Sequence, residues 1–252
     1  MNTLRILSIG AGAIGTYIGG SLALLGHKVV FVERPQVVNE LQTHGLQISG
    51  VSVNKEPFTH HILPEKLRFF SSINAAVEHS VFDVALYALK SYDTPAFIDE
   101  LQDSKDGSNK LPPFLCLSNG VANEPALAGV LGTDNVIAGT VTSAIGRREA
   151  GDILVERLRG VGVGATHPVS VELTREMNSA GLNAQLFPKA RDMKWSKMLT
   201  NLIANASSAI LDMPPADIFG NPRLYQLEID QLRETLAVMN ALNINAVDLP
   251  GT

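Results

Sequence analysis

Short apolar runs alternate with helical stretches from residue 4 to about residue 187. Most of these runs are apolar throughout, as expected of strands that are buried on both faces of a parallel sheet. The alternation predicts the α/β class, with a doubly wound sheet covered by helices on both sides. The expected strands are Arg5–Ile9, Val29–Val32, Phe82–Tyr87, Phe114–Leu117 and Val136–Val141, and a hairpin at the sheet edge is expected from Gly151–Val155 and Gly160–Val163.

The pattern changes near residue 188. Residues 190–211 contain no glycine or proline and keep a helical period, which predicts one long helix. Pro214 and Pro215 interrupt this period, and residues 222–243 are helical again, beginning with a proline that suits the first turn of a helix. The second part of the chain is therefore expected to be all-helical.

The domain organisation follows from this change. We predict a Rossmann-type dinucleotide-binding domain over residues 1–188 and a smaller helical domain, for substrate binding and dimerisation, over residues 189–252. Two long helices form a poor core on their own, so the second domain is expected to be incomplete, packed on the first or dimeric. The apolar residues expected to lack partners, and so to favour a homo-oligomer, are Leu224, Leu227, Leu232, Leu236 and Met239.

Composition narrows the class of function. The 252 residues are 45% apolar, which excludes intrinsic disorder, and the net charge of -5 has the wrong sign for a nucleic-acid partner. The one cysteine, Cys116, cannot form an internal disulfide, and the adjacent His60 and His61 point to different sides of any regular element. We therefore expect a reducing compartment and no metal site. The sequence offers no apolar stretch suited to a signal peptide or a membrane span, which predicts a cytoplasmic protein without a membrane partner.

A glycine-rich turn follows the first expected strand directly and opens a helix; it reads Gly10-Ala11-Gly12-Ala13-Ile14-Gly15. Gly10 suits a tight turn, Gly12 lets the backbone approach a pyrophosphate, and Gly15 lets the helix pack closely on the strand. The helix N-terminus offers unpaired N–H groups and the positive end of its dipole to the diphosphate. The motif alone is weak evidence, but its place between a strand and a helix predicts a bound dinucleotide.

The choice of dinucleotide depends on two residues at the end of the second expected strand. Glu33 and Arg34 lie 18 and 19 residues after Gly15. A carboxylate at this place usually binds the ribose 2′-hydroxyl of NAD, whereas an arginine holds the 2′-phosphate of NADP. Because both residues are present, this position leaves both cofactors open.

A polar stripe lies on the first helix predicted for the second domain. Lys197, Asn201, Asn205, Ser208 and Asp212 fall within one quarter of the circumference of that helix. Asparagine is a poor helix former but offers donors and acceptors, which favours a substrate-binding wall over an ordinary exposed face. A lysine facing a partly dry cleft has a lowered pKa, so Lys197 can polarise a ketone and protonate its oxygen.

Four motifs occur in a specific order along the chain. The first is the glycine turn, and the others are Ala88-Leu89-Lys90-Ser91-Tyr92-Asp93-Thr94, Leu117-Ser118-Asn119-Gly120-Val121 with Asn123-Glu124, and Trp195-Ser196-Lys197-Met198-Leu199-Thr200-Asn201 with Asn205. Together they resemble the ketopantoate reductase (2-dehydropantoate 2-reductase) family along essentially the whole chain.

The resemblance implies a set of cofactor residues besides the glycine turn. Arg34 and Lys90 match the family's clamp on the adenosine 2′-phosphate, and Asn119 and Ala144 match its contacts near the nicotinamide. Two charge-assisted contacts of about 1.5 to 3 kcal/mol each would outweigh the repulsion from one Glu33 that can turn toward solvent. We therefore expect NADP as cofactor, with NAD possible because of Glu33.

The resemblance also implies the reaction. Lys197 matches the family's proton donor, Asn201 and Asn205 match its substrate-binding asparagines, and Asn119 is expected beside them. The implied function is the NADPH-dependent reduction of a small 2-keto acid, in the first place of 2-dehydropantoate to pantoate in pantothenate biosynthesis.

Three departures from the family pattern keep alternatives open. Glu33 replaces the small or neutral residue usual there, Pro214-Pro215-Ala216 stands where an asparagine is often found, and the further helices that carry a serine and a glutamate of the family's site do not occur in this sequence. The alternatives are a reductase of another 2-keto acid and a non-catalytic NAD(P)-binding or redox-sensing paralogue.

Overall fold

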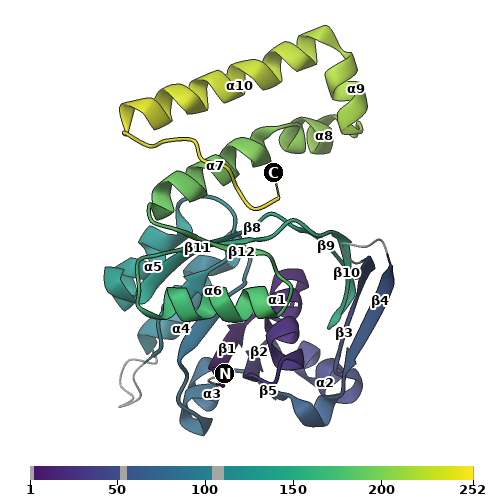
Figure 1. Ribbon diagram of the computed structural model, residues 1–252, viewed down its shortest axis with the longest axis vertical. Helices are drawn as coiled ribbons and strands as arrows, with labels where there is room; N and C mark the ends of the chain where they lie inside the picture. The colour runs from purple at the N-terminus through teal and green to yellow at the C-terminus, as the bar shows by residue number, and fades with distance from the viewer. Residues whose placement is uncertain (1–2, 52–55, 104–110, 252) are drawn as a thin grey trace.

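A large, mostly parallel sheet forms the centre of the protein (Figure 1). The computed structural model describes residues 3–51, 56–103 and 111–251. The strands of this eight-stranded sheet are, in spatial order, β12 (Ala184–Phe187), β11 (Val161–Gly164), β8 (Val136–Val141), β7 (Phe114–Cys116), β6 (Val84–Tyr87), β1 (Arg5–Ile9), β2 (Lys28–Val32) and β5 (Arg68–Phe70). A second sheet has four strands in the order β4 (Pro57–Ile62), β3 (Leu46–Val51), β10 (Asp152–Arg157) and β9 (Ala144–Glu149).

Helices cover both faces of the large sheet. They are α1 (Ala13–Leu24), α2 (Pro35–His44), α3 (Ile73–His79), α4 (Thr94–Asp103), α5 (Asn123–Leu131) and α6 (Val169–Ser179), with short 3-10 turns η1 (Pro64–Lys66), η2 (Ser91–Asp93) and η4 (Thr133–Asn135). Along β1, Ile6 lies in a core cluster with side chains of α1 and α6, whereas Leu7 lies in the opposite cluster with side chains of α4 and α5. Burial on both faces explains why the parallel strands are apolar throughout.

The predicted α/β class and the five principal strands are confirmed. β1 and β8 have the predicted bounds, and β2, β6 and β7 differ from the prediction by at most two residues at one end. The alternation of apolar and helical stretches was therefore sufficient to locate the centre of the sheet.

The hairpin predicted from Gly151–Val155 and Gly160–Val163 is wrong, because the two strands belong to different sheets. β10 pairs with β9 and β3 in the small sheet, whereas β11 pairs with β8 and β12 in the large one. Burial explains the division: along β10 only Ile153 and Val155 are buried, but every residue of β11 is. A strand with one buried face suits the small sheet. A strand with two buried faces suits the large sheet, which helices cover on both sides.

The chain from residue 190 to residue 241 is all-helical and lies beyond one end of the large sheet (Figure 1). Its helices are α7 (Ala190–Leu202), α8 (Asn205–Leu211), α9 (Pro215–Gly220) and α10 (Pro222–Ala241). Pro222 occupies the first turn of α10 as predicted, and the Asn221 side chain accepts hydrogen bonds from two backbone N–H groups of that turn. The predicted helical second part is thus confirmed.

The single long helix predicted over residues 190–211 is wrong, because the chain breaks between α7 and α8. Ala204 adopts a left-handed conformation with φ of 56°. Its N–H donates to the buried carboxylate of Glu228 on α10 at 2.7 Å, and the Ser207 hydroxyl donates to the other oxygen of that carboxylate. A buried acceptor from a distant helix thus compensates for the strained backbone at the break.

The segment after α10 runs back along α7, so that the C-terminal end lies near β8 (Figure 1). The N–H of Val247 donates to the Ser196 hydroxyl at 2.9 Å, and the Thr142 hydroxyl donates to the Pro250 carbonyl at 2.7 Å. Leu249 is buried in a small apolar cluster with Met193. The helical part therefore packs on the α/β part. This contact supplies apolar core that the helices of the second part would lack on their own.

Replacing Glu228 with alanine is expected to lower the free energy of unfolding by about 2 to 3 kcal/mol, because two buried donors lose a charged acceptor. Urea denaturation measures this difference. The matched control is Glu234→Ala, an exposed position on the same helix, where the change should stay within about 0.5 kcal/mol. Equal effects of the two substitutions would contradict the assignment of the break to Glu228.

Candidate active site

The parallel strands bring their carboxyl ends to one edge of the large sheet. The spatial order reverses between β1 and β6, since β2 and β5 lie to one side and β7 and β8 to the other. Such a switch point is where open α/β sheets bind their ligands. The residues predicted for the cofactor follow these strand ends: Gly10–Gly15 after β1, Arg34 after β2, Lys90 after β6, Asn119 after β7 and Ala144 after β8.

The glycine turn has the geometry of a diphosphate cradle. Gly10 has φ of 95°, and its N–H donates to the carbonyl of Val32 at 2.9 Å, which joins the turn to the end of β2. A Cβ on Gly15 would lie 1.9 Å from the Gly10 carbonyl oxygen, so this glycine is needed for packing. A Cβ on Gly12 would meet nothing within 4 Å, so no contact of the described chain requires a glycine there. The space over Gly12, beside the N-terminus of α1, fits the diphosphate of a dinucleotide.

Glu33 is held by the backbone rather than turned toward solvent as the sequence analysis assumed. Its Oε2 accepts the N–H of Ala11 in the glycine turn at 3.0 Å, and its Oε1 accepts the N–H of Arg34 at 3.1 Å. The Glu33 side chain is 13% exposed, whereas the Arg34 side chain is 74% exposed, with its Nε 3.5 Å from the same Oε1. A carboxylate is therefore fixed between β2 and the glycine turn.

Lys90 and Ala144 lie at the same edge of the sheet and are exposed. Lys90 immediately precedes η2, and Ala144 is the first residue of β9. Their predicted cofactor contacts stay predictions.

Lys197 lies on α7 and is half-buried. Burial lowers the pKa of its ammonium group, and the positive charges of Arg159 and Lys194 lower the pKa further. Both effects favour the neutral amine, as expected of a lysine that gives up a proton during a reaction.

Asn201 connects α7 to the loop after β7. Its Nδ2 donates to Oδ1 of Asn119 at 3.3 Å. The structure thus brings together two of the predicted substrate-binding amides, one on the helix that carries Lys197 and one in the loop after β7.

Asn205 lies on a different helix from Lys197 and Asn201. It is exposed at the start of α8, beyond the break at Ala204. The polar stripe predicted from Lys197 to Asp212 is therefore not continuous: Asn205 and Ser208 lie on α8, and Asp212 follows it in a left-handed conformation.

A buried charge that the sequence did not single out also lies at this edge of the sheet. Lys194, whose side chain is 6% exposed, donates from Nζ to the carbonyls of Ser118 at 2.7 Å and Gly139 at 3.2 Å. Its Nζ also lies 2.7 Å from Oε1 of Glu124, at the start of α5. The only signal in the sequence was a lysine three residues before Lys197.

The loop after β7 is also tied to the end of β6 and to α4. The Ser118 hydroxyl donates to the carbonyl of Leu89 at 2.7 Å, and the Asn123 amide donates to the carbonyl of Asn119 at 2.9 Å. The other atom of that amide, Oδ1, accepts the hydroxyl of Thr94 at 2.8 Å. These bonds join two of the motifs singled out in the sequence, Ala88–Thr94 and the one that begins at Leu117.

Across residues 3–51, 56–103 and 111–251, no group of three or more His, Cys, Asp or Glu side chains could hold a metal ion. Within the same ranges no helix is long and apolar enough to cross a membrane.

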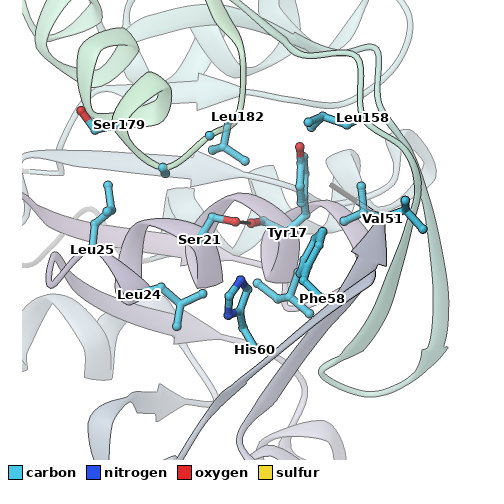
Figure 2. Close-up of a pocket in the computed structure, with 14 residues that line it drawn as sticks. Tyr17, Ser21, Leu24, Leu25, Val51, Phe58, His60, Leu158, Ser179 and Leu182 are labelled. Atoms are coloured by element: carbon cyan, nitrogen blue, oxygen red, sulfur yellow. Dashed lines mark hydrogen bonds between the residues drawn. The ribbon is translucent and has the colours of Figure 1, made fainter. Parts of the chain in front are cut away.

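A separate pocket of about 560 Å³ lies between α1, the small sheet and the end of α6. Figure 2 shows its mostly apolar wall, to which Tyr17, Leu24, Phe58 and Leu182 contribute. None of the predicted site residues lines this pocket.

Comparison with known proteins agrees with the geometry. The sequence model of the family described as ketopantoate reductase PanE/ApbA matches residues 6–167, and that of its C-terminal part matches residues 189–249. The chain is 26% identical over 249 residues to the 2-dehydropantoate 2-reductase of Pyrococcus horikoshii, covering 96% of this chain and 76% of that protein. It is 24% identical over 252 residues to that of Archaeoglobus fulgidus, covering 95% of this chain and 76% of that protein.

Solved structures show the same likeness. The PanE/ApbA family ketopantoate reductase of Ralstonia eutropha JMP134 superposes with a TM-score of 0.82 at 27% identity, covering 97% of this chain and 77% of that one. D-mandelate dehydrogenase in complex with NADH has the same fold, with a TM-score of 0.75 at 20% identity, covering 96% of this chain and 75% of that one. The motifs, the fold and the match over both parts of the chain together place this protein in the ketopantoate reductase PanE/ApbA family of oxidoreductases.

Proposed function

We propose that this protein reduces a small 2-keto acid, with 2-dehydropantoate, which would yield pantoate, as the favoured substrate. The observation that carries the proposal is the contact between Asn201 and Asn119, which sets the helix bearing a half-buried Lys197 against the carboxyl edge of the sheet. The relatives named 2-dehydropantoate 2-reductase support the choice of substrate.

The chain's own residues supply the proton and the substrate contacts. A nicotinamide dinucleotide, when bound, would supply the hydride for the keto carbon. Lys197 donates its Nζ proton to the keto oxygen, so that the ketone becomes a hydroxyl and Lys197 is left neutral. Asn119 and Asn201, with Asn205, offer amide donors and acceptors to the carboxylate and hydroxyl groups of the substrate.

We propose NADH as the preferred cofactor, with NADPH bound more weakly through Arg34 and Lys90. The sequence favoured NADP on the premise that Glu33 turns away. Because Glu33 is held by the N–H of Ala11, its carboxylate lies where a ribose 2′-hydroxyl would be accepted and a 2′-phosphate repelled. Another protein of this fold, D-mandelate dehydrogenase, forms a complex with NADH.

Replacing Lys197 with methionine is expected to lower kcat by about 10² to 10⁴-fold, the range for a lost general acid, and to leave nucleotide affinity unchanged. Because the acid must be protonated, wild-type kcat should be constant at low pH and fall as pH rises through the pKa of Lys197. Burial lowers that pKa, so the fall should begin below the ordinary lysine value of about 10.4. Initial rates with 2-dehydropantoate and other 2-keto acids, measured against pH, test this.

The control for Lys197 is Lys189→Met, an exposed position at the start of the same helix, which should keep wild-type rates. Tight nucleotide binding without turnover on any 2-keto acid would overturn the reductase proposal in favour of a non-catalytic, redox-sensing role.

Replacing Glu33 with alanine is expected to strengthen NADPH binding by about tenfold and to weaken NADH binding, because the fixed carboxylate is removed. Arg34→Ala should weaken NADPH about tenfold and leave NADH nearly unchanged. Isothermal titration of each variant with both nucleotides measures these changes, with the exposed Glu40→Ala on α2 as control. A wild type that prefers NADPH, together with a silent Glu33 substitution, would refute the proposed preference.

We propose self-association through the helical part. Of the residues predicted to lack partners, Met239 is buried within the chain, but Leu227 and Leu236 are 50% and 46% exposed on α10. Sedimentation velocity at micromolar concentration should give a dimer or larger species, and Leu227→Glu with Leu236→Glu should shift it to the monomer. A wild-type chain that sediments as a monomer would contradict this.

A further inference from the structure

We propose that Lys194, with its partly buried counterion Glu124, is a positioning residue for the reduction: it holds the loop that carries Asn119 against the face of α7 that carries Lys197. This inference rests on the proposed function of Lys197 and Asn119. The contacts that support it lie at the junction of β7, β8, α5 and α7.

The Lys194 ammonium group makes two hydrogen bonds and one ion pair. It has three N–H donors and three acceptors within reach, the carbonyls of Ser118 and Gly139 and the carboxylate of Glu124, at 2.7, 3.2 and 2.7 Å. Both charged side chains are shielded from solvent, with exposed fractions of 6% for Lys194 and 15% for Glu124. The two hydrogen bonds and the ion pair connect α7 to the loop after β7, to β8 and to α5.

The spacing along α7 places Lys197 between two attachments to one loop. Lys194 binds the carbonyl of Ser118, and Asn201, seven residues further on, binds the side chain of the next loop residue, Asn119. Lys197 lies three residues after Lys194 and four before Asn201, so the three share one face of the helix. Holding the loop at two points about 10 Å apart along the helix fixes it relative to Lys197.

Stability alone is a weak reason for such a pair. Desolvating two charges is costly, and apolar side chains of similar volume hold a packed interface as well or better. Apolar packing is non-directional, however, and would leave the loop free to shift relative to the helix. The directional contacts of Lys194 are therefore better suited to orienting the loop relative to α7 than to stabilising the interface between them.

Lys194 also lowers the pKa of Lys197. The groups that lower the pKa of Lys197 besides burial are Arg159, which precedes β11, and Lys194. Glu124, from α5, is paired with Lys194. Glu228, from α10, is engaged with Ala204 and Ser207. Removing Lys194 therefore raises the pKa of Lys197.

The test compares wild type with the double variant Lys194→Met/Glu124→Leu, which leaves no buried charge without a partner. The expected result is unchanged NADH affinity by isothermal titration, a kcat lowered by about tenfold or more with little change in KM, and an alkaline limb of the kcat profile at higher pH. Lys194→Arg, which keeps the charge and the donors, should restore most of kcat. Lys189→Met, at an exposed position, is the control.

A folded double variant with wild-type kcat and an unmoved alkaline limb would overturn the proposal. If the double variant does not fold, Lys194→Met/Glu124→Gln is measured instead, and a wild-type kcat with an unmoved alkaline limb in that variant overturns the proposal equally. A readout independent of turnover is the NMR titration of Lys197 labelled by reductive ¹³C-dimethylation. A higher titration midpoint of Lys197 in the variant supports the inference, and an unchanged midpoint counts against it. This holds even if the wild type reduces no keto acid. Such a lack of activity would refute only the proposed reaction.

Discussion

One buried ammonium group joins the helical part of the chain to the edge of the sheet where its loops meet. Lys194 of α7 is bound by the carbonyl of Ser118 after β7, the carbonyl of Gly139 in β8 and the carboxylate of Glu124 in α5. An ammonium group has three donors and no acceptor. Each of these oxygen atoms must therefore lie within reach of the Lys194 Nζ. The relation between α7 and the sheet is thereby set by directional bonds rather than by apolar contact alone.

The loop that Lys194 holds is also the point where distant motifs meet. Ser118 is tied to the end of β6 through Leu89, and Asn123 links the backbone of Asn119 to Thr94 at the start of α4. Parallel strands make this possible, because every crossover returns the chain to the same edge of the sheet. Residues separated by more than 100 positions, such as Thr94 and Asn201, therefore become parts of one network.

The helical part shows how a buried charge can override local preference. The sequence between residues 190 and 211 is compatible with one uninterrupted helix, since it lacks glycine and proline. The chain nevertheless breaks at Ala204, where the carboxylate of Glu228 accepts the backbone N–H and the hydroxyl of Ser207. A desolvated carboxylate needs donors, and the helix that packs against it supplies them. The break separates Asn205 from the helix that carries Lys197.

The sequence alone determined the elements whose signals are local. Continuous apolar runs located the parallel strands, and the glycine turn was recognised because a strand precedes it and a helix follows. Tertiary structure decided what depends on partners far along the chain: the separate sheets of β10 and β11, the break at Ala204, the attachment of Glu33 to Ala11 and the burial of Lys194. The physical reason is that periodicity and propensity report on neighbours within a few residues. A buried charge, in contrast, is satisfied by whichever donors and acceptors the fold brings to it.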